Sequence, residues 1–213
     1  MTENAPQCVR CSVLRCASKT KEGPAPSFCP TEKYASLTKD VLDKYRQPEN
    51  QAVIEGWLRL MGRVRDPSKP KETFTWTRVH EVMEYARIRG MKKLGIATCG
   101  SLLHESKLLA DILEHHGFEV ASVACLCGEV NPQALGLPGD IFCNPILQAE
   151  VLNQEKTALN IVMGLCVGHD ILFLRHSRAE TTPLVVRDIS LGNNPAAALY
   201  QSQGFYKDRF FGP

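Results

Sequence analysis

The sequence lacks the motifs that assign many proteins to a familiar class. Its 213 residues contain no Walker phosphate loop, no G-x-G-x-x-G fingerprint, no G-x-S-x-G elbow and no H-E-x-x-H motif. Nucleotide-binding, hydrolase and metalloprotease functions therefore have no motif to support them. What the chain has in quantity is cysteine, at nine residues.

Long apolar runs are also absent, and a membrane-spanning helix needs about twenty apolar residues. The first ten residues are polar and include Cys8, unlike the apolar centre of a secretory signal. We therefore expect a cytoplasmic protein with no membrane partner. An odd number of cysteines in such a protein argues against a disulfide framework and favours thiolates that bind metal or take part in chemistry.

The overall composition is that of an ordinary globular chain, with 44% hydrophobic and 23% charged residues. The net charge is only +2. Basic residues alternate with acidic ones along the expected helices, which is typical of solvated helix faces. A nucleic-acid partner is therefore not expected, and salt-dependent retention on DNA or RNA would test this.

Four cysteines lie close together near the start of the chain, with the spacing C-x2-C-x4-C-x12-C. Residues 1–30 contain too few large apolar side chains to build a core, so a bound metal is the interaction most able to order them. Four thiolates suit a closed, structural zinc site, and an iron-sulfur cluster is the rival occupant. The sequence predicts a zinc knuckle with the ligands Cys8, Cys11, Cys16 and Cys29.

Beyond the knuckle the pattern divides into two parts. Residues 31–92 show the three-and-four apolar spacing of one-sided helices, in stretches at 34–45, 53–64 and 79–86, and predict a helical region packed on the core. Residues 93–213 alternate short apolar runs with helices, and strands are expected at 94–98, 120–124, 160–165 and 184–187. Further helices are expected to open at Gly100-Ser101, Asn144-Pro145 and Asn194-Pro195. The fold class predicted is α/β, with a Rossmann-like, mostly parallel sheet of about four strands in three layers.

A second group of cysteines follows the expected strands. Cys99, Cys125 and Cys166 each come after a strand, and Cys143 precedes a helix that begins at Asn144. Parallel strands end along one edge of their sheet, so these thiols are expected to converge there. The sequence predicts an iron-sulfur cluster or a second zinc at this edge, bound by Cys99, Cys125, Cys143 and Cys166.

Two polar residues beside the third strand are candidates for catalysis. His169 follows Cys166 closely and is a candidate ligand or acid/base. Asp170 is expected to cap the next helix. Cys127, two residues after Cys125, is the alternative ligand from the second strand.

The tail from Asn194 to Phe205, with its L-Y-x-x-x-G-F pattern, resembles a helix of the acetyl-coenzyme A dependent N-acetyltransferases. The pyrophosphate-binding loop that those enzymes carry before this helix has no counterpart in the chain. An N-acetyltransferase-like function is therefore a remote alternative.

A second resemblance spans nearly the whole chain. The opening cysteines, the segments 143–153 and 164–170 and the Asn194-Pro195 helix start resemble a prokaryotic family of cysteine-rich domains of unknown function, described as metal-binding. The family pattern has one cysteine where this chain has two, and that position matches Cys125. The resemblance implies metal binding and no particular reaction.

These features are consistent with two kinds of function. The first is a redox or sulfur-related metalloenzyme that handles its substrate at the second cysteine group. The second is a non-catalytic module, stabilised by zinc, that binds a small molecule or a partner. Visible thiolate-to-iron absorption would favour the first, and a colourless protein with one zinc would favour the second.

Overall fold

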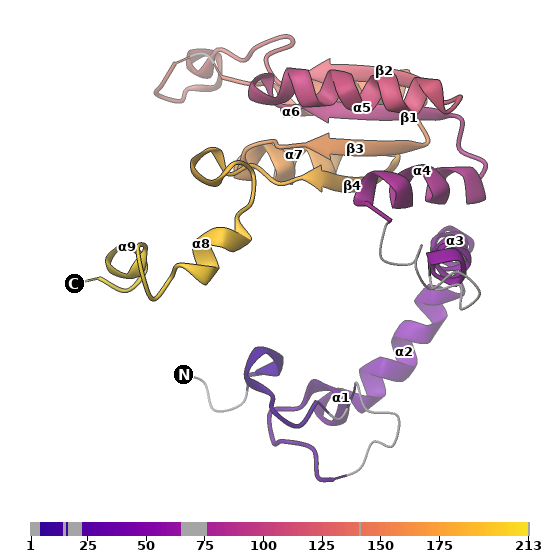
Figure 1. Cartoon of the computed structure of the whole chain (residues 1–213), viewed down its shortest axis with the longest axis vertical. Helices are drawn as coiled ribbons and strands as arrows, with labels where there is room; N and C mark the ends of the chain where they lie inside the picture. Colours follow the sequence, from indigo (N-terminus) through magenta and orange to yellow (C-terminus); the bar gives the residue numbers. More distant parts are fainter. Residues whose placement is uncertain (1–4, 15, 17–22, 65–75, 141, 213) are drawn as a thin grey trace. The chain divides into compact units, whose positions relative to one another are not determined.

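The computed structural model describes residues 5–14, 16, 23–64, 76–140 and 142–212 (Figure 1). The chain forms two compact units, Met1–Arg59 and Leu60–Pro213. This division differs from the expected boundaries after residues 30 and 92, and the three-part organisation stays a prediction. No helix in the described ranges is both long enough and apolar enough to span a bilayer.

The first unit is built from short helical elements. They are the 3-10 helix η1 (Cys8–Arg10), α1 (Pro30–Lys33), α2 (Ala35–Tyr45) and most of α3 (Pro48–Val64). Proline stands at the first position of both α1 and α3, where its fixed φ favours the helix and its missing N–H is not needed. The two long helices coincide with the stretches that the apolar spacing predicted.

The second unit begins with the end of α3 and α4 (Arg78–Ile88), whose N-cap Thr77 accepts a hydrogen bond from the His80 amide. Its sheet has four strands, β1 (Lys93–Thr98), β2 (Glu119–Ala124), β3 (Leu159–Met163) and β4 (Glu180–Val185). All neighbouring strands are parallel, in the order β2-β1-β3-β4 (Figure 1). The mixed α/β class and the four-stranded parallel sheet are confirmed.

Helices connect these strands and cover them. η2 (Gly100–Leu102) and α5 (Leu103–His115) follow β1, α6 (Pro145–Gln154) lies between β2 and β3, and α7 (Val167–His176) lies between β3 and β4. One core cluster joins α4 and α5 to side chains of β1 and β3, including Ile96 and Ile161. Another joins α6 and α7 to the alternate side chains Ala97 and Val162. The two clusters lie on opposite faces of the sheet because successive strand residues point to opposite sides.

Two strand boundaries differ from those expected. The third strand ends at Met163, because Gly164 has a φ of +64° and turns the chain. The fourth strand was expected at 184–187 but spans Glu180–Val185. Pro183 argues against a strand in the sequence, because proline has no N–H to donate to a neighbouring strand. β4 tolerates it because it lies at the edge of the sheet. The pairing with β3 shifts register near this proline.

The chain after β4 forms short helical elements. They are η4 (Ile189–Leu191), α8 (Ala196–Tyr200) and α9 (Lys207–Phe211). A further 3-10 element, η3 (Pro132–Leu135), lies between β2 and α6. The helix expected to open at Asn194-Pro195 is present as α8, with Pro195 as its N-cap.

Candidate functional site at the carboxyl edge of the sheet

The register of the strands brings their carboxyl ends level. Thr98, the last residue of β1, pairs with Ala124 of β2 and with Met163 of β3. Cys99 and Cys125 are therefore the first residues beyond two neighbouring strands. Backbone bonds hold them there, since the Cys99 amide donates to Met163 and the Cys125 amide donates to Thr98.

The sulfur of Cys125 is the centre of the cysteine cluster, which we define as Cys99, Cys125, Cys143 and Cys166. Cys143 Sγ donates to Cys125 Sγ over 3.3 Å, and the Gly100 amide donates to the same sulfur, also over 3.3 Å. The Asn144 amide donates to the Cys125 carbonyl at 2.8 Å, which holds the Cys143 segment against the end of β2. Cys127 is exposed in the turn that follows, so the structure places Cys125 rather than Cys127 beside Cys143.

The other two sulfurs of the cluster have polar partners. Cys99 Sγ lies 3.2 Å from the Ser101 hydroxyl. Arg187, just beyond β4, donates from Nη1 to Cys166 Sγ. Gly164 lets the Leu102 side chain pack closely against the backbone here, since a Cβ at this position would lie 2.2 Å from Leu102 Cδ1.

Arg187 was not identified from the sequence. It was interpreted as the end of the fourth strand, whereas the strand stops two residues earlier and leaves the arginine free to reach Cys166. The available signal in the sequence was a single arginine at the end of the apolar run 184–186.

The environment of the cluster separates the pKa values of its thiols. Burial raises the pKa of Cys143 to about 11, and the hydrogen bond to Cys125 and the charges of the other three sulfurs act in the same direction. Burial would also raise the pKa of Cys99, but hydrogen bonds from Ser101 and the charge of Arg187 outweigh it, and the pKa is lowered. The cluster therefore favours the thiolate at one position and the thiol at another.

His169 and Asp170 lie in the first turn of α7, beside the cluster. Burial lowers the pKa of His169, and the positive charge of Arg187 lowers it further. Burial raises the pKa of Asp170, and His169 opposes that shift. Asp170 is not the helix cap that was expected, because α7 begins directly after Cys166, which occupies the N-cap. A catalytic role for either residue stays a prediction.

Gln148 on α6 is a further residue that sequence reasoning missed. Its side chain is fully buried, and Nε2 donates to the Thr98 carbonyl at 3.1 Å and the Val123 carbonyl at 2.8 Å. It joins the helix to the ends of β1 and β2, where the cluster begins. Among the described residues, its Oε1 has no hydrogen-bond partner.

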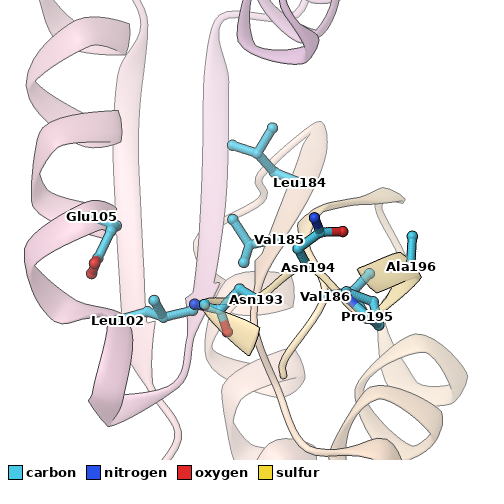
Figure 2. A pocket seen from close by; sticks show the side chains of 10 residues that line it. Leu102, Glu105, Leu184, Val185, Val186, Asn193, Asn194, Pro195 and Ala196 are labelled. Atoms are coloured by element: carbon cyan, nitrogen blue, oxygen red, sulfur yellow. The ribbon is translucent and has the colours of Figure 1, made fainter. Parts of the chain in front are cut away.

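A cavity of about 490 Å³ lies between the start of the β1–α5 connection and the segment after β4 (Figure 2). Figure 2 shows Leu102 and Glu105 on one side and the segment after β4, with Asn193 and Pro195, on the other. Its walls are mostly apolar. Leu102, which lies against Gly164, is shared between the cavity and the surroundings of the cluster.

The first cysteine group lies in a different setting. Cys8 opens η1, the Cys11 amide donates to the Cys8 carbonyl at 3.1 Å, and Cys29 is the N-cap of α1. The amide of Glu32 is the main cause that lowers the pKa of Cys29, although burial opposes it. Cys8 and Cys16 are exposed.

Across the described ranges, no three His, Cys, Asp or Glu side chains are already arranged to hold a metal ion. In the second group the closest described approach is the pair Cys125 and Cys143. Metal ligation by either cysteine group therefore stays a prediction.

Residues 29–184 match the family described as "Protein of unknown function (DUF1847)". The chain belongs to this family. A relative in Methanocaldococcus jannaschii, described as "Uncharacterized protein MJ0455", is 37% identical over 177 residues, which is 77% of this chain and 83% of that protein. No solved structure matches the chain.

The DUF1847 match includes every residue of the cysteine cluster, together with Gln148 and His169. It begins at Cys29, after the first three cysteines of the predicted knuckle, and ends before Arg187. The matched region therefore contains the complete set of four sulfurs at the sheet edge.

Proposed function

We propose that the protein binds a thiophilic metal ion, zinc, through the cysteine cluster at the carboxyl edge of its sheet. The observation that carries the proposal is the 3.3 Å separation between the sulfurs of Cys125 and Cys143. A tetrahedral zinc with bonds of about 2.3 Å places two sulfur ligands about 3.8 Å apart. A small movement of either side chain reaches that distance.

The chemistry of the donors also suits zinc. Four thiolates around one Zn²⁺ leave a net charge of about −2, which a buried site must offset. Arg187 supplies a positive charge at Cys166, and the Gly100 amide donates to Cys125. An iron-sulfur cluster is the rival occupant, and visible thiolate-to-iron absorption distinguishes it from zinc.

The arrangement of the fold supports a ligand at this position. We infer a Rossmann-like, three-layer organisation from the strand order β2-β1-β3-β4 and from the two core clusters on opposite faces. Sheets of this kind bind ligands outside the carboxyl ends of their strands. His169 is the candidate acid or base for a metalloenzyme at this edge, including a redox or sulfur-related one.

The first cysteine group is proposed to be a separate, structural zinc knuckle formed by Cys8, Cys11, Cys16 and Cys29. The support is the lack of buried apolar side chains among the residues described before Leu60. A segment without its own core needs another source of order, and zinc binding supplies one.

Elemental analysis of protein purified without oxygen tests both sites. Cys8→Ser and Cys166→Ser are each expected to lose a different zinc equivalent, and exposed Cys127→Ser is the matched control that keeps both. Unchanged metal content in Cys166→Ser contradicts the site at the sheet edge. Visible thiolate-to-iron absorption that is lost in Cys166→Ser would mean that this site holds an iron-sulfur cluster instead of zinc.

A second candidate function is small-molecule binding without catalysis, and the cavity beside Leu102 favours it. Its apolar walls and the Glu105 carboxylate suit a small alkylamine. Saturation-transfer NMR with butylamine is expected to show binding that is lost in Ala196→Trp, which fills the cavity. Leu199→Trp, at an exposed position on the same short helix, is the control that keeps binding. Equal signals from both variants contradict this candidate.

A further inference from the structure

We propose that Cys125 and Cys143 are a redox-active dithiol, which a low-molecular-weight disulfide converts into an intramolecular disulfide. The two sulfurs lie 3.3 Å apart, and a disulfide bond is about 2.05 Å long. The bond between the Asn144 amide and the Cys125 carbonyl keeps the two segments side by side. Closing the bond therefore requires a movement of little more than about 1 Å.

The two thiols differ in access, which assigns them an order of reaction. Cys143 is half-buried and lies in the loop before α6, so a small reagent reaches it first. Cys125 is only 3% exposed, and it meets Cys143 rather than solvent. Access rather than acidity sets this order: Cys143 attacks first although its pKa is raised, and Cys125 is the resolving thiol.

Cys99 is the competing partner, since it directly follows β1, the strand that pairs with the one Cys125 follows. Cys99 and Cys125, however, both directly follow paired strands, and backbone bonds to Met163 and Thr98 fix their positions. The side chain of Cys99 is further engaged with Ser101. Cys143 comes from a loop, which adjusts to the geometry of a disulfide with less strain.

The reaction consists of two exchange steps with the external disulfide RSSR. Cys143, after loss of its proton to solvent, attacks one sulfur, forms a mixed disulfide and releases RS⁻. Cys125, having also lost its proton, then attacks the Cys143 sulfur, forms the Cys125–Cys143 bond and releases a second RS⁻. Two thiols are oxidised and one disulfide is reduced to two thiolates, which take up the two protons.

The oxidised pair cannot ligate a metal as thiolates. This consequence rests on the proposed function: if the cluster holds zinc, the disulfide removes two of its four ligands and releases the ion. The dithiol itself depends only on the two sulfurs and is tested without metal.

The experiment treats reduced, metal-free protein with oxidised glutathione and maps the peptides by mass spectrometry without reduction. The expected product is a peptide pair joined through Cys125 and Cys143, lighter by two hydrogens, with no glutathione on either residue. Exposed cysteines carry glutathione instead. A Cys99–Cys125 link, or glutathione retained on Cys143 in the unaltered protein, overturns the proposal.

Two variants separate the steps. Cys125→Ser is expected to accumulate glutathione on Cys143, because the resolving thiol is missing. Cys143→Ser is expected to leave Cys125 unmodified, and Cys127→Ser is the control that forms the same link as the unaltered chain. The peptide map of the unaltered protein decides the proposal even if a variant does not fold.

Zinc-loaded protein provides the second arm, with release followed by a chromogenic chelator. Release in step with formation of the link supports both the dithiol and the metal site. A link that forms without any zinc being bound or released supports the dithiol and contradicts the proposed metal site.

Discussion

The two cysteine groups belong to regions that are stabilised in opposite ways. In the unit Leu60–Pro213, the cysteine cluster lies beside a packed core in which Ile96, Ile161 and Leu152 are fully buried. In the unit Met1–Arg59, Cys8 and Cys16 are exposed, and no described apolar side chain before Leu60 is buried. The same residue type is therefore positioned by a packed core in one unit and by local turns in the other.

This difference indicates what each group needs from a ligand. The packed sheet positions the segments that carry the cysteine cluster, so a ligand there is not needed to order them and is free to serve chemistry. Among the described residues, the bonds of the first group are local, such as that from the Cys11 amide to the Cys8 carbonyl. A ligand there is expected to supply most of the stability of its segment.

Removing the metal provides the largest test of this contrast. A chelator is expected to expose the chain to trypsin after Arg10 and Lys33 while the thermal unfolding of the sheet unit changes little. Zinc in a four-thiolate site contributes on the order of ten kcal/mol to folding, which exceeds what this segment gains from packing. Limited proteolysis with mass spectrometry measures the effect, and added zinc should reverse it. Identical cleavage with and without chelator would show that no metal orders the segment.

A matched pair of leucine substitutions comes next in size. Leu152→Ala in the core of the sheet unit is expected to lower the free energy of unfolding by about 2–5 kcal/mol, because it leaves a cavity. Leu37→Ala, at a side chain that is 52% exposed on α2, should cost less than about 1 kcal/mol. Urea unfolding followed by circular dichroism compares them. Similar losses would mean that α2 buries this leucine in solution.

The glutamine at the strand ends gives an intermediate effect. Gln148→Met removes two hydrogen bonds to buried carbonyls and is expected to destabilise the sheet unit by about 1–3 kcal/mol. Gln51→Met, on the exposed face of α3, is the control and should change stability by less than about 0.5 kcal/mol. Thermal unfolding reports both. A neutral Gln148→Met would mean that the unpartnered Oε1 offsets the two bonds.

The smallest effect concerns pH. Burial and the hydrogen bond to Glu180 raise the pKa of Tyr85 from 10 to about 12. Because the folded pKa is the higher one, the stabilisation is complete below pH 10 and is lost as the pH rises through about 12.

Tyr85→Phe should abolish this pH dependence and cost less than about 1 kcal/mol at neutral pH, because the hydroxyl is half-buried and partly screened. Unfolding measured between pH 9 and about 12 tests the prediction. Tyr45→Phe, in the first unit, serves as the control. A slope that survives in Tyr85→Phe assigns the effect to other groups.

Much of the α/β unit was predictable because its signals are local. The apolar runs of β1 and β2 located those strands within one residue, and the Asn144-Pro145 start of α6 was read directly. The fourth strand was misplaced because Pro183 is unfavourable in a strand in general and acceptable at this edge in particular. Whether a strand lies at an edge depends on the whole sheet.

The candidate site was predictable in outline and not in detail. Parallel strands must end at one edge, so Cys99 and Cys125 could be expected as neighbours. The partners Arg187 and Gln148 could not, since each reaches across 21 or more residues to its contact. Such contacts depend on how separate elements pack.

The sequence by itself determined the alternation of strands and helices, and with it a parallel sheet that has cysteines at its carboxyl edge. These follow from apolar periodicity, helix caps and the handedness of crossovers, which are properties of short segments. Only the tertiary structure decided that Cys143 meets Cys125, and that Arg187 meets Cys166. Those pairs are set by packing between distant segments, where a shift of about 1 Å decides whether two atoms are in contact.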